Sequence, residues 1–410
     1  MFRRFPLFAI AVCIAAPCLA QSPAPGPIDL PLVYSTTPMT RNADLMLSAS
    51  IMSTSATEAG LANISSSLFR STRWTARSAR AAKLALFDVP VAYYFGTLNH
   101  EWGHQTKASG YGVDTDLLFE GTPWSGQPFF LYVLDPMPDD PLAESTTQGG
   151  GMAASAVMKA RAEGMMLRAE RVPYGLALAA ILASLDEPMY ALTNLGSSSL
   201  SPERVAENWI RGDPSQLVVD LNRRRSAWGP SSLDGIRRDV RARSLLNLVD
   251  TALWSETASV LGDYVWKGEP NGRVRWLGIG GAQLLPSLRY ELSPYGPEYY
   301  VRSHYRARGF TGTGYGRWTE PIGIERQVGG GFSVAGWSLP RVRPGVSVDA
   351  WSHTRQGFGM RGEVQVEAVG WPHERAALTV AAGAKSSGYL LGFPMDNGAY
   401  INAGVNVRVW

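Results

Sequence analysis

The chain has 410 residues, of which 45% are hydrophobic, and a formal net charge of +3 at pH 7. Because the charges nearly balance, we expect no basic surface of the kind that binds nucleic acid. The two cysteines, Cys13 and Cys18, both lie near the N-terminus, so the rest of the chain offers neither disulfides nor thiolate metal ligands.

Residues 1–20, "MFRRFPLFAIAVCIAAPCLA", have the pattern of a secretory signal peptide: two arginines, an apolar run and small residues before the cleavage point. Its removal lowers the formal charge from +3 to +1, because both arginines are lost. Lipid attachment at Cys18 is an alternative, which Pro17 disfavours. After cleavage the chain is longer than one hydrophobic core usually spans, so we expect two domains.

Residues 21–70 are rich in Ser, Thr, Ala and Pro, and their first part, "QSPAPGPIDLPL", predicts a mobile linker. Residues 71–268 predict a mostly helical domain. After a helix over residues 76–87, Asp88 offers an N-cap and Pro90 a first-turn proline for a helix that ends at Gly110.

Further along the helical region, the short β-type run "FFLYV" could be one arm of a hairpin. Asp213 and Pro214 are a clear start signal for one helix, and Asp186 and Glu187 are expected at the end of another. No apolar run reaches the ~18 residues of a membrane-spanning helix. The helices expected after Gly110 cover residues 152–172, 175–187, 202–210, 214–225 and 235–266.

Residues 269–410 change to a period of two, with about eight runs of roughly ten residues separated by Gly, Pro and Asn. In one run, apolar and small residues alternate with charged ones: Tyr299, Val301, Ser303, Tyr305 and Ala307 oppose Tyr300, Arg302, His304, Arg306 and Arg308. This texture is typical of an outer-membrane β-barrel. A soluble β-sandwich is the alternative, because Trp410 shares parity with the polar side of the last run.

The sequence therefore predicts an α+β chain. A helical domain comes first, and a C-terminal antiparallel β-barrel of about eight strands follows it.

The segment "LNHEWGHQT" places His100 and His104 four residues apart, on one face of the expected helix. Two imidazoles can present nitrogens to one metal ion, and they favour zinc over calcium or magnesium. Glu101 lies beside this face, where it can take a proton from a zinc-activated water. Two unrelated histidines on one helix are the simpler alternative.

"HEWGH" resembles the HExxH signature of the zinc metallopeptidases called zincins. The resemblance covers these five residues and the helix around them. It implies that His100 and His104 bind Zn²⁺ and that Glu101 is the general base and acid of peptide hydrolysis, with a protein or peptide as substrate.

A catalytic zinc needs a third protein ligand, and no further histidine follows closely. We expect Glu163, because a carboxylate on a mostly apolar helix stripe needs a reason to be buried, and a metal supplies one. Pairing of Glu163 with a neighbouring Lys159 or Arg161 is the alternative. Glu170 and Glu120 are the next candidates.

Three whole-protein hypotheses follow. The first is an exported zinc peptidase with its helical domain in the periplasm, anchored in outer-membrane lipid by its β-domain. The second is a non-enzymatic outer-membrane barrel with a helical periplasmic domain. The third is a soluble periplasmic protein whose β-half binds a partner or a glycan.

Overall fold

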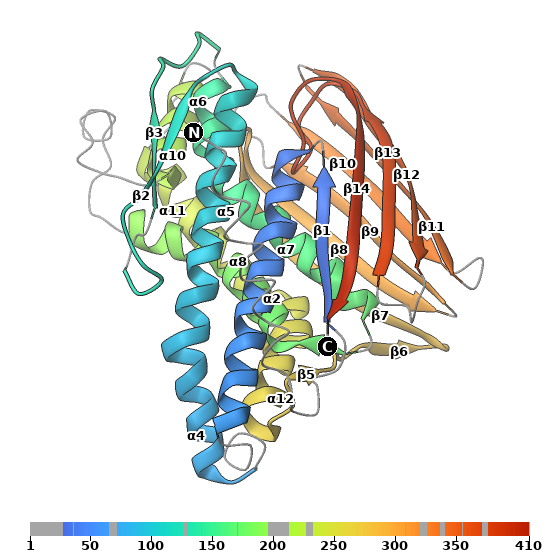
Figure 1. Cartoon of the computed structure of the whole chain (residues 1–410). Coiled ribbons are helices and arrows are strands. Elements are labelled where there is room, and N and C mark those ends of the chain that lie inside the picture. The colour runs from blue at the N-terminus through green and yellow to red at the C-terminus, as the bar shows by residue number, and fades with distance from the viewer. Residues whose placement is uncertain are drawn as a thin grey trace.

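The chain folds into a helical layer packed against one face of a large antiparallel sheet (Figure 1). This confirms the α+β class. The computed structural model describes residues 28–35, 37–64, 72–125, 129–140, 142–169, 171–195, 213–226, 233–307, 309–319, 326–336, 341–354, 356–370 and 376–409. The predicted signal peptide, the helix expected over 202–210, Glu170 and Trp410 lie outside these ranges.

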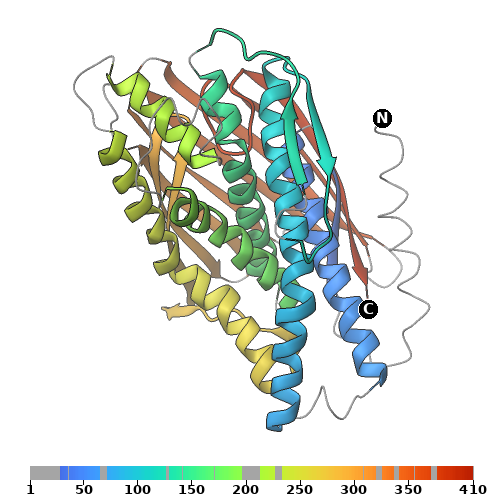
Figure 2. The ribbon, with the colours of Figure 1, turned by 90° about the vertical axis from the view of Figure 1, so that its left-hand side faces the viewer.

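The helices form the layer seen in front of the sheet in Figure 2. A single helix was expected over residues 235–266, but the chain there divides into several shorter elements. The bounds are α2 Pro38–Ile64, α4 Trp74–Lys83, η2 Leu84–Asp88, α5 Val89–Gly110, α6 Ala143–Gln148, α7 Gly150–Arg168, α8 Tyr174–Asn194, α10 Asp213–Ser226, α11 Leu233–Ser244, η3 Leu245–Val249, η4 Leu253–Ala258 and α12 Ser259–Lys267.

Helix α5 begins as predicted with Pro90 in its first turn and ends at Gly110, but Asp88 does not cap it. Its carboxylate instead accepts hydrogen bonds from Lys83 Nζ (2.7 Å) and Thr57 Oγ1 (3.1 Å). A buried lysine is a stronger partner for a carboxylate than backbone amides that the preceding π-helical turn already engages.

The main core lies between α2, α5, α7 and α8. Helix α8 is longer than the sequence suggested. Within the described ranges it is the one helix long and apolar enough to cross a membrane, yet 61% of its apolar window is buried inside the protein. Burial of this kind is what a core helix of a globular domain requires, so α8 is weak evidence for a membrane span.

The sheet has ten strands in the order β1-β14-β13-β12-β11-β10-β9-β8-β7-β6. A two-stranded hairpin, β2 with β3, contains the predicted "FFLYV" strand, and β4 pairs with β5. The bounds are β1 Ile28–Ser35, β2 Thr115–Phe119, β3 Phe129–Val133, β4 Val172–Pro173, β5 Asn271–Gly272, β6 Leu277–Ile279, β7 Ala282–Ser293, β8 Gly296–Ala307, β9 Phe310–Thr319, β10 Gln327–Gly336, β11 Val342–His353, β12 Gly357–Val369, β13 Ala376–Lys385 and β14 Gly398–Val409.

The eight long strands β7–β14 match the expected number, but the expected closed barrel is wrong, because β1 and β6 are not paired with each other. Helix α2 packs on β1, and α7 packs on β7, so helices occupy the side where a barrel would close (Figure 1). The expected linker is also wrong for residues 28–35, which form β1 and pair with the last strand, β14.

Candidate metal site

Helices α5 and α7 approach closely where two glycines meet. A Cβ on Gly103 would overlap the carbonyl oxygen of Gly150 and lie 2.6 Å from Ala154 Cβ. The next residue of α7, Gly151, lies directly over the histidine pair, and a Cβ there would overlap His100 Nε2. The glycine inside "HEWGH" therefore does more than leave space beside the ligands, because it lets a second helix cover them.

Both imidazoles are buried and held through Nδ1. His104 Nδ1 donates to the carbonyl oxygen of Thr147 (2.7 Å), and His100 Nδ1 lies 2.9 Å from Asp186 Oδ2. The ring of His100 also stacks on Tyr190, with centroids 4.9 Å apart. A carbonyl or carboxylate on Nδ1 fixes the tautomer of a neutral histidine, so both Nε2 lone pairs point at the same space.

The third group at this space is Asp213, the first residue of α10. Its Oδ2 lies 2.7 Å from His100 Nε2 and 3.0 Å from His104 Nε2. The ligand atoms of these three residues lie within 4.8 Å of one another, and no other such group occurs in the described part of the chain. Two imidazole nitrogens and one carboxylate oxygen, each with a lone pair, face the same space. The negative charge of Asp213 must therefore be balanced by protons on the imidazoles or by a bound cation.

The pKa values show how the metal-free protein balances these charges. Burial alone lowers the pKa of both histidines, but Asp213 outweighs it at His104, and Tyr190, Asp186 and Asp213 outweigh it at His100, so both pKa values are raised. The pKa of Asp213 is lowered, since the two histidines outweigh its burial. The three side chains therefore form an ion cluster, with the negative Asp213 against the two histidines.

The donor set fits zinc. Two imidazole nitrogens and one carboxylate oxygen are three protein ligands, the number that a catalytic zinc site uses while keeping one position open. The Asp186–His100 contact supplies the outer carboxylate that commonly orients a zinc-bound histidine. The residues present are therefore suited to hold Zn²⁺ through His100, His104 and Asp213.

Glu101 lies on α5 between the two ligands in sequence and is 8% exposed. Burial raises the pKa of its carboxyl group, and Asp213 and Asp186 add to this, although His104 and His100 oppose it. A carboxylate with a raised pKa is a better proton acceptor near neutral pH. The general-base role of Glu101 stays a prediction.

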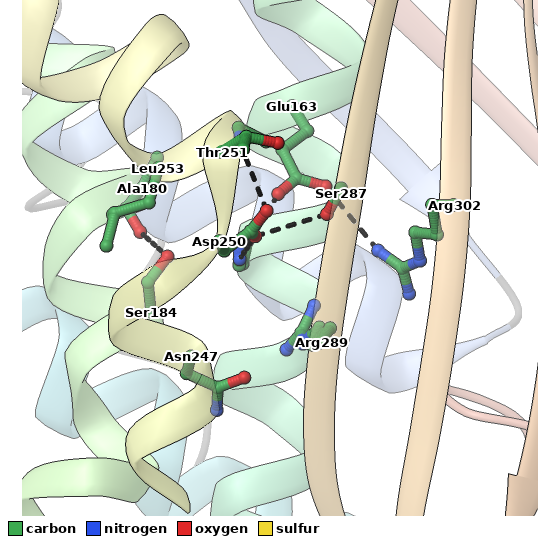
Figure 3. Close-up of polar contacts among 12 residues, drawn as sticks. Glu163, Ala180, Ser184, Asn247, Asp250, Thr251, Leu253, Ser287, Arg289 and Arg302 are labelled. Atoms are coloured by element: carbon green, nitrogen blue, oxygen red, sulfur yellow. Dashed lines mark hydrogen bonds and ion pairs between the residues drawn. The ribbon is translucent and has the colours of Figure 1, made fainter.

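Glu163 does not reach this site. It lies twelve residues after Gly151 on α7, which is about 18 Å along a helix. Its carboxylate is 3.4 Å from Lys159 Nζ and 3.5 Å from Arg302 Nη1, as Figure 3 shows for Arg302. Burial opposes ionisation, but these cations outweigh it and lower the pKa of Glu163 to about 2. The metal role expected for Glu163 is therefore wrong, and the alternative of pairing with Lys159 describes it.

Of the two other candidates, Glu120 is exposed just after β2 and belongs to no metal-ligand group in the described part of the chain. Glu170 lies outside the described residues. The sequence alone predicts Asp213 and Asp186 at helix ends and assigns neither a role in the site. The one sequence signal at Asp213 is the Asp-Pro start of α10.

Comparison with protein-family models, with curated proteins and with solved structures finds no match to this chain.

Proposed function

We propose that this protein is a zinc-dependent hydrolase of peptide bonds, with His100, His104 and Asp213 as the metal ligands and Glu101 as general base. The observation that carries the proposal is the contact of one Asp213 oxygen with both Nε2 atoms. The HExxH resemblance predicts a metal at these nitrogens, and the carboxylate of Asp213 beside both of them supports it as the third ligand.

Zinc bound at these residues would act as a Lewis acid that polarises the scissile carbonyl and lowers the pKa of a coordinated water. The chain supplies the rest. Glu101 accepts a proton from the attacking water and passes it to the nitrogen of the leaving amine. Asp186 and the carbonyl of Thr147 hold the imidazoles in position, which keeps the ligand geometry fixed during the reaction.

The proposed substrate is a protein or peptide outside the cytoplasm, and the predicted signal peptide supports export. In this proposal the helical domain works in the periplasm. The non-enzymatic alternative keeps the same fold but uses the histidine pair and Asp213 as a buried ion cluster without metal.

Metal analysis of the untagged full chain tests the proposal. We expect one zinc per chain in the wild type, none in His104→Ala, and one in Glu101→Gln, which loses hydrolysis of a quenched-fluorescent peptide library. Glu163→Gln is the matched control, because it removes a buried carboxylate from α7 away from the site, and it should keep its zinc. A wild type without zinc, or a Glu101→Gln variant that hydrolyses peptides normally, would overturn the proposal.

A further inference from the structure

The sheet has one face that is apolar and exposed. We call it the outer face. It carries the even-numbered residues of β9–β13 and the odd-numbered residues of β14 as far as Val405. None of these positions holds a charged residue, and Ser352 is the one residue among them with a hydroxyl group. Its large side chains are 50% to 61% exposed at Val328, Phe332, Met360, Val364, Leu378 and Ile401.

The opposite face of the same strands has the reverse character. It faces the helical layer (Figure 2) and the segment between β13 and β14, and it carries ion pairs such as Arg317 with Glu298 of β8 (3.0 Å) and Arg361 with Asp349 (2.8 Å). A sheet that packs a helical layer in water normally buries its apolar face and exposes the polar one. Here the polarity is inverted.

The outer face needs a cover, because proteins in water rarely expose contiguous apolar patches larger than a few hundred Å². Its dimensions suit a bilayer. The six strands are 10 to 13 residues long, and about 9–11 residues of a tilted strand cross a hydrocarbon core of about 30 Å. A protein partner would need polar groups at the rim to fix its register, and acyl chains need none.

We propose that the outer face contacts the acyl chains of a phospholipid bilayer. Glycine, alanine and aliphatic side chains pointing outward, with charges pointing inward, are the arrangement that lipid requires of a sheet. On the open side, α2 against β1 and α7 against β7 place helices in the gap. Helices satisfy their own backbone hydrogen bonds, and at the free edge of β7 the side chain of Asn247 bonds the backbone N–H and carbonyl of Tyr290 (2.9 and 3.0 Å). This proposal does not rest on the proposed catalysis.

Flotation of the exported chain, from which the predicted signal peptide has been cleaved, with vesicles of phosphatidylcholine alone tests the bilayer contact. Because the outer face carries no charge, binding should not depend on salt or on adding phosphatidylglycerol. The combined variant Val364→Arg and Ile401→Arg should reduce the vesicle-bound fraction at least tenfold. The matched control, Leu86→Arg with Val249→Arg, places the same charges at residues of the helical layer that are each 61% exposed, and it should bind like the wild type.

A milder substitution keeps the test valid if the arginine variant fails to fold. Because both cysteines lie in the predicted signal peptide, Val364→Cys and Val249→Cys can each carry one polarity-sensitive dye. The dye at residue 364 should shift to the blue in vesicles and be quenched by nitroxide-labelled lipid, and the dye at residue 249 should do neither. A detergent-free wild type that ignores vesicles would overturn the proposal. If that protein is a dimer broken by Val364→Arg, a second copy covers the face.

Discussion

The sharpest perturbation of the metal site is Gly151→Ala, because it adds one methyl group at the ligand atoms. The new Cβ would overlap His100 Nε2 and lie 2.5 Å from His104 Nε2. Replacing a helical glycine by alanine normally gains about 0.5–1 kcal/mol, whereas forcing an extra carbon into a packed site costs about 1–3 kcal/mol. We expect a net destabilisation of about 0–2.5 kcal/mol and the loss of zinc, since the methyl group takes the space of the ion.

Gly164→Ala on the same helix is the control, because a Cβ there has no atom within 4 Å. It should be stabilised by about 0.5–1 kcal/mol and keep one zinc. The assay is thermal unfolding with and without zinc. A metal at 100 times its Kd stabilises by about 2.7 kcal/mol, so wild type and Gly164→Ala should gain this on adding zinc and Gly151→Ala should gain nothing. Normal zinc stabilisation of Gly151→Ala would refute the placement of the ion.

Three further outcomes follow from the same geometry. Asp213→Asn should lower zinc affinity at least tenfold in a competition titration with a chelator, whereas Glu163→Gln should leave it unchanged while lowering the midpoint of thermal unfolding. Zinc binding should weaken on acidification, by about tenfold per pH unit for each proton that the metal displaces from His100 or His104, as isothermal titration at several pH values would show. The free energy of unfolding without zinc has the opposite pH dependence. The raised histidine pKa values contribute stability that is complete below about pH 6.5 and lost at higher pH. The lowered pKa of Asp213 contributes stability that is lost as the pH falls below about 3.8. Denaturant unfolding from pH 3 to 9 should therefore show the metal-free chain most stable between these values, and a curve that rises steadily to pH 9 would contradict the ion cluster.

The part of the site that sequence could predict is the part set by a local period. Helical geometry alone places His100 and His104 on one face, and α5 forms as its sequence predicts. Asp213 reaches the histidines because a helix more than a hundred residues later packs against α6 and α8, and one sequence carries no such information. Glu163 shows the same limit from the other side. Its burial does need a cation, but Lys159 and Arg302 supply the positive charge in place of a metal.

For the sheet, too, the sequence predicts the local structure but not the long-range arrangement. Alternation predicts the strands and the sides of their residues, because the period of two is a property of the extended backbone. Closure depends on what lies at the two edges. Strand β1 lies in a proline-rich stretch of the kind that predicts a linker, and it contains Pro31. An edge strand tolerates a proline, because the backbone on its outer side needs no hydrogen-bond donor. The helices packed against β1 and β7 then leave the sheet open.

Helix α7 ties the two halves of the chain together. Its N-terminal turn covers the histidines through Gly151, and further along it meets the inner face of the sheet, where Arg289 donates to the carbonyl of Ala156 (3.0 Å) and Arg302 pairs with Glu163. Removing the sheet would take Arg302 away from the buried Glu163 and leave it paired with Lys159 alone, and losing one partner of a buried ion pair costs about 3–5 kcal/mol. The candidate metal site therefore depends on a helix that β7 and β8 hold in place, and the proposed lipid contact lies on the opposite face of the same sheet.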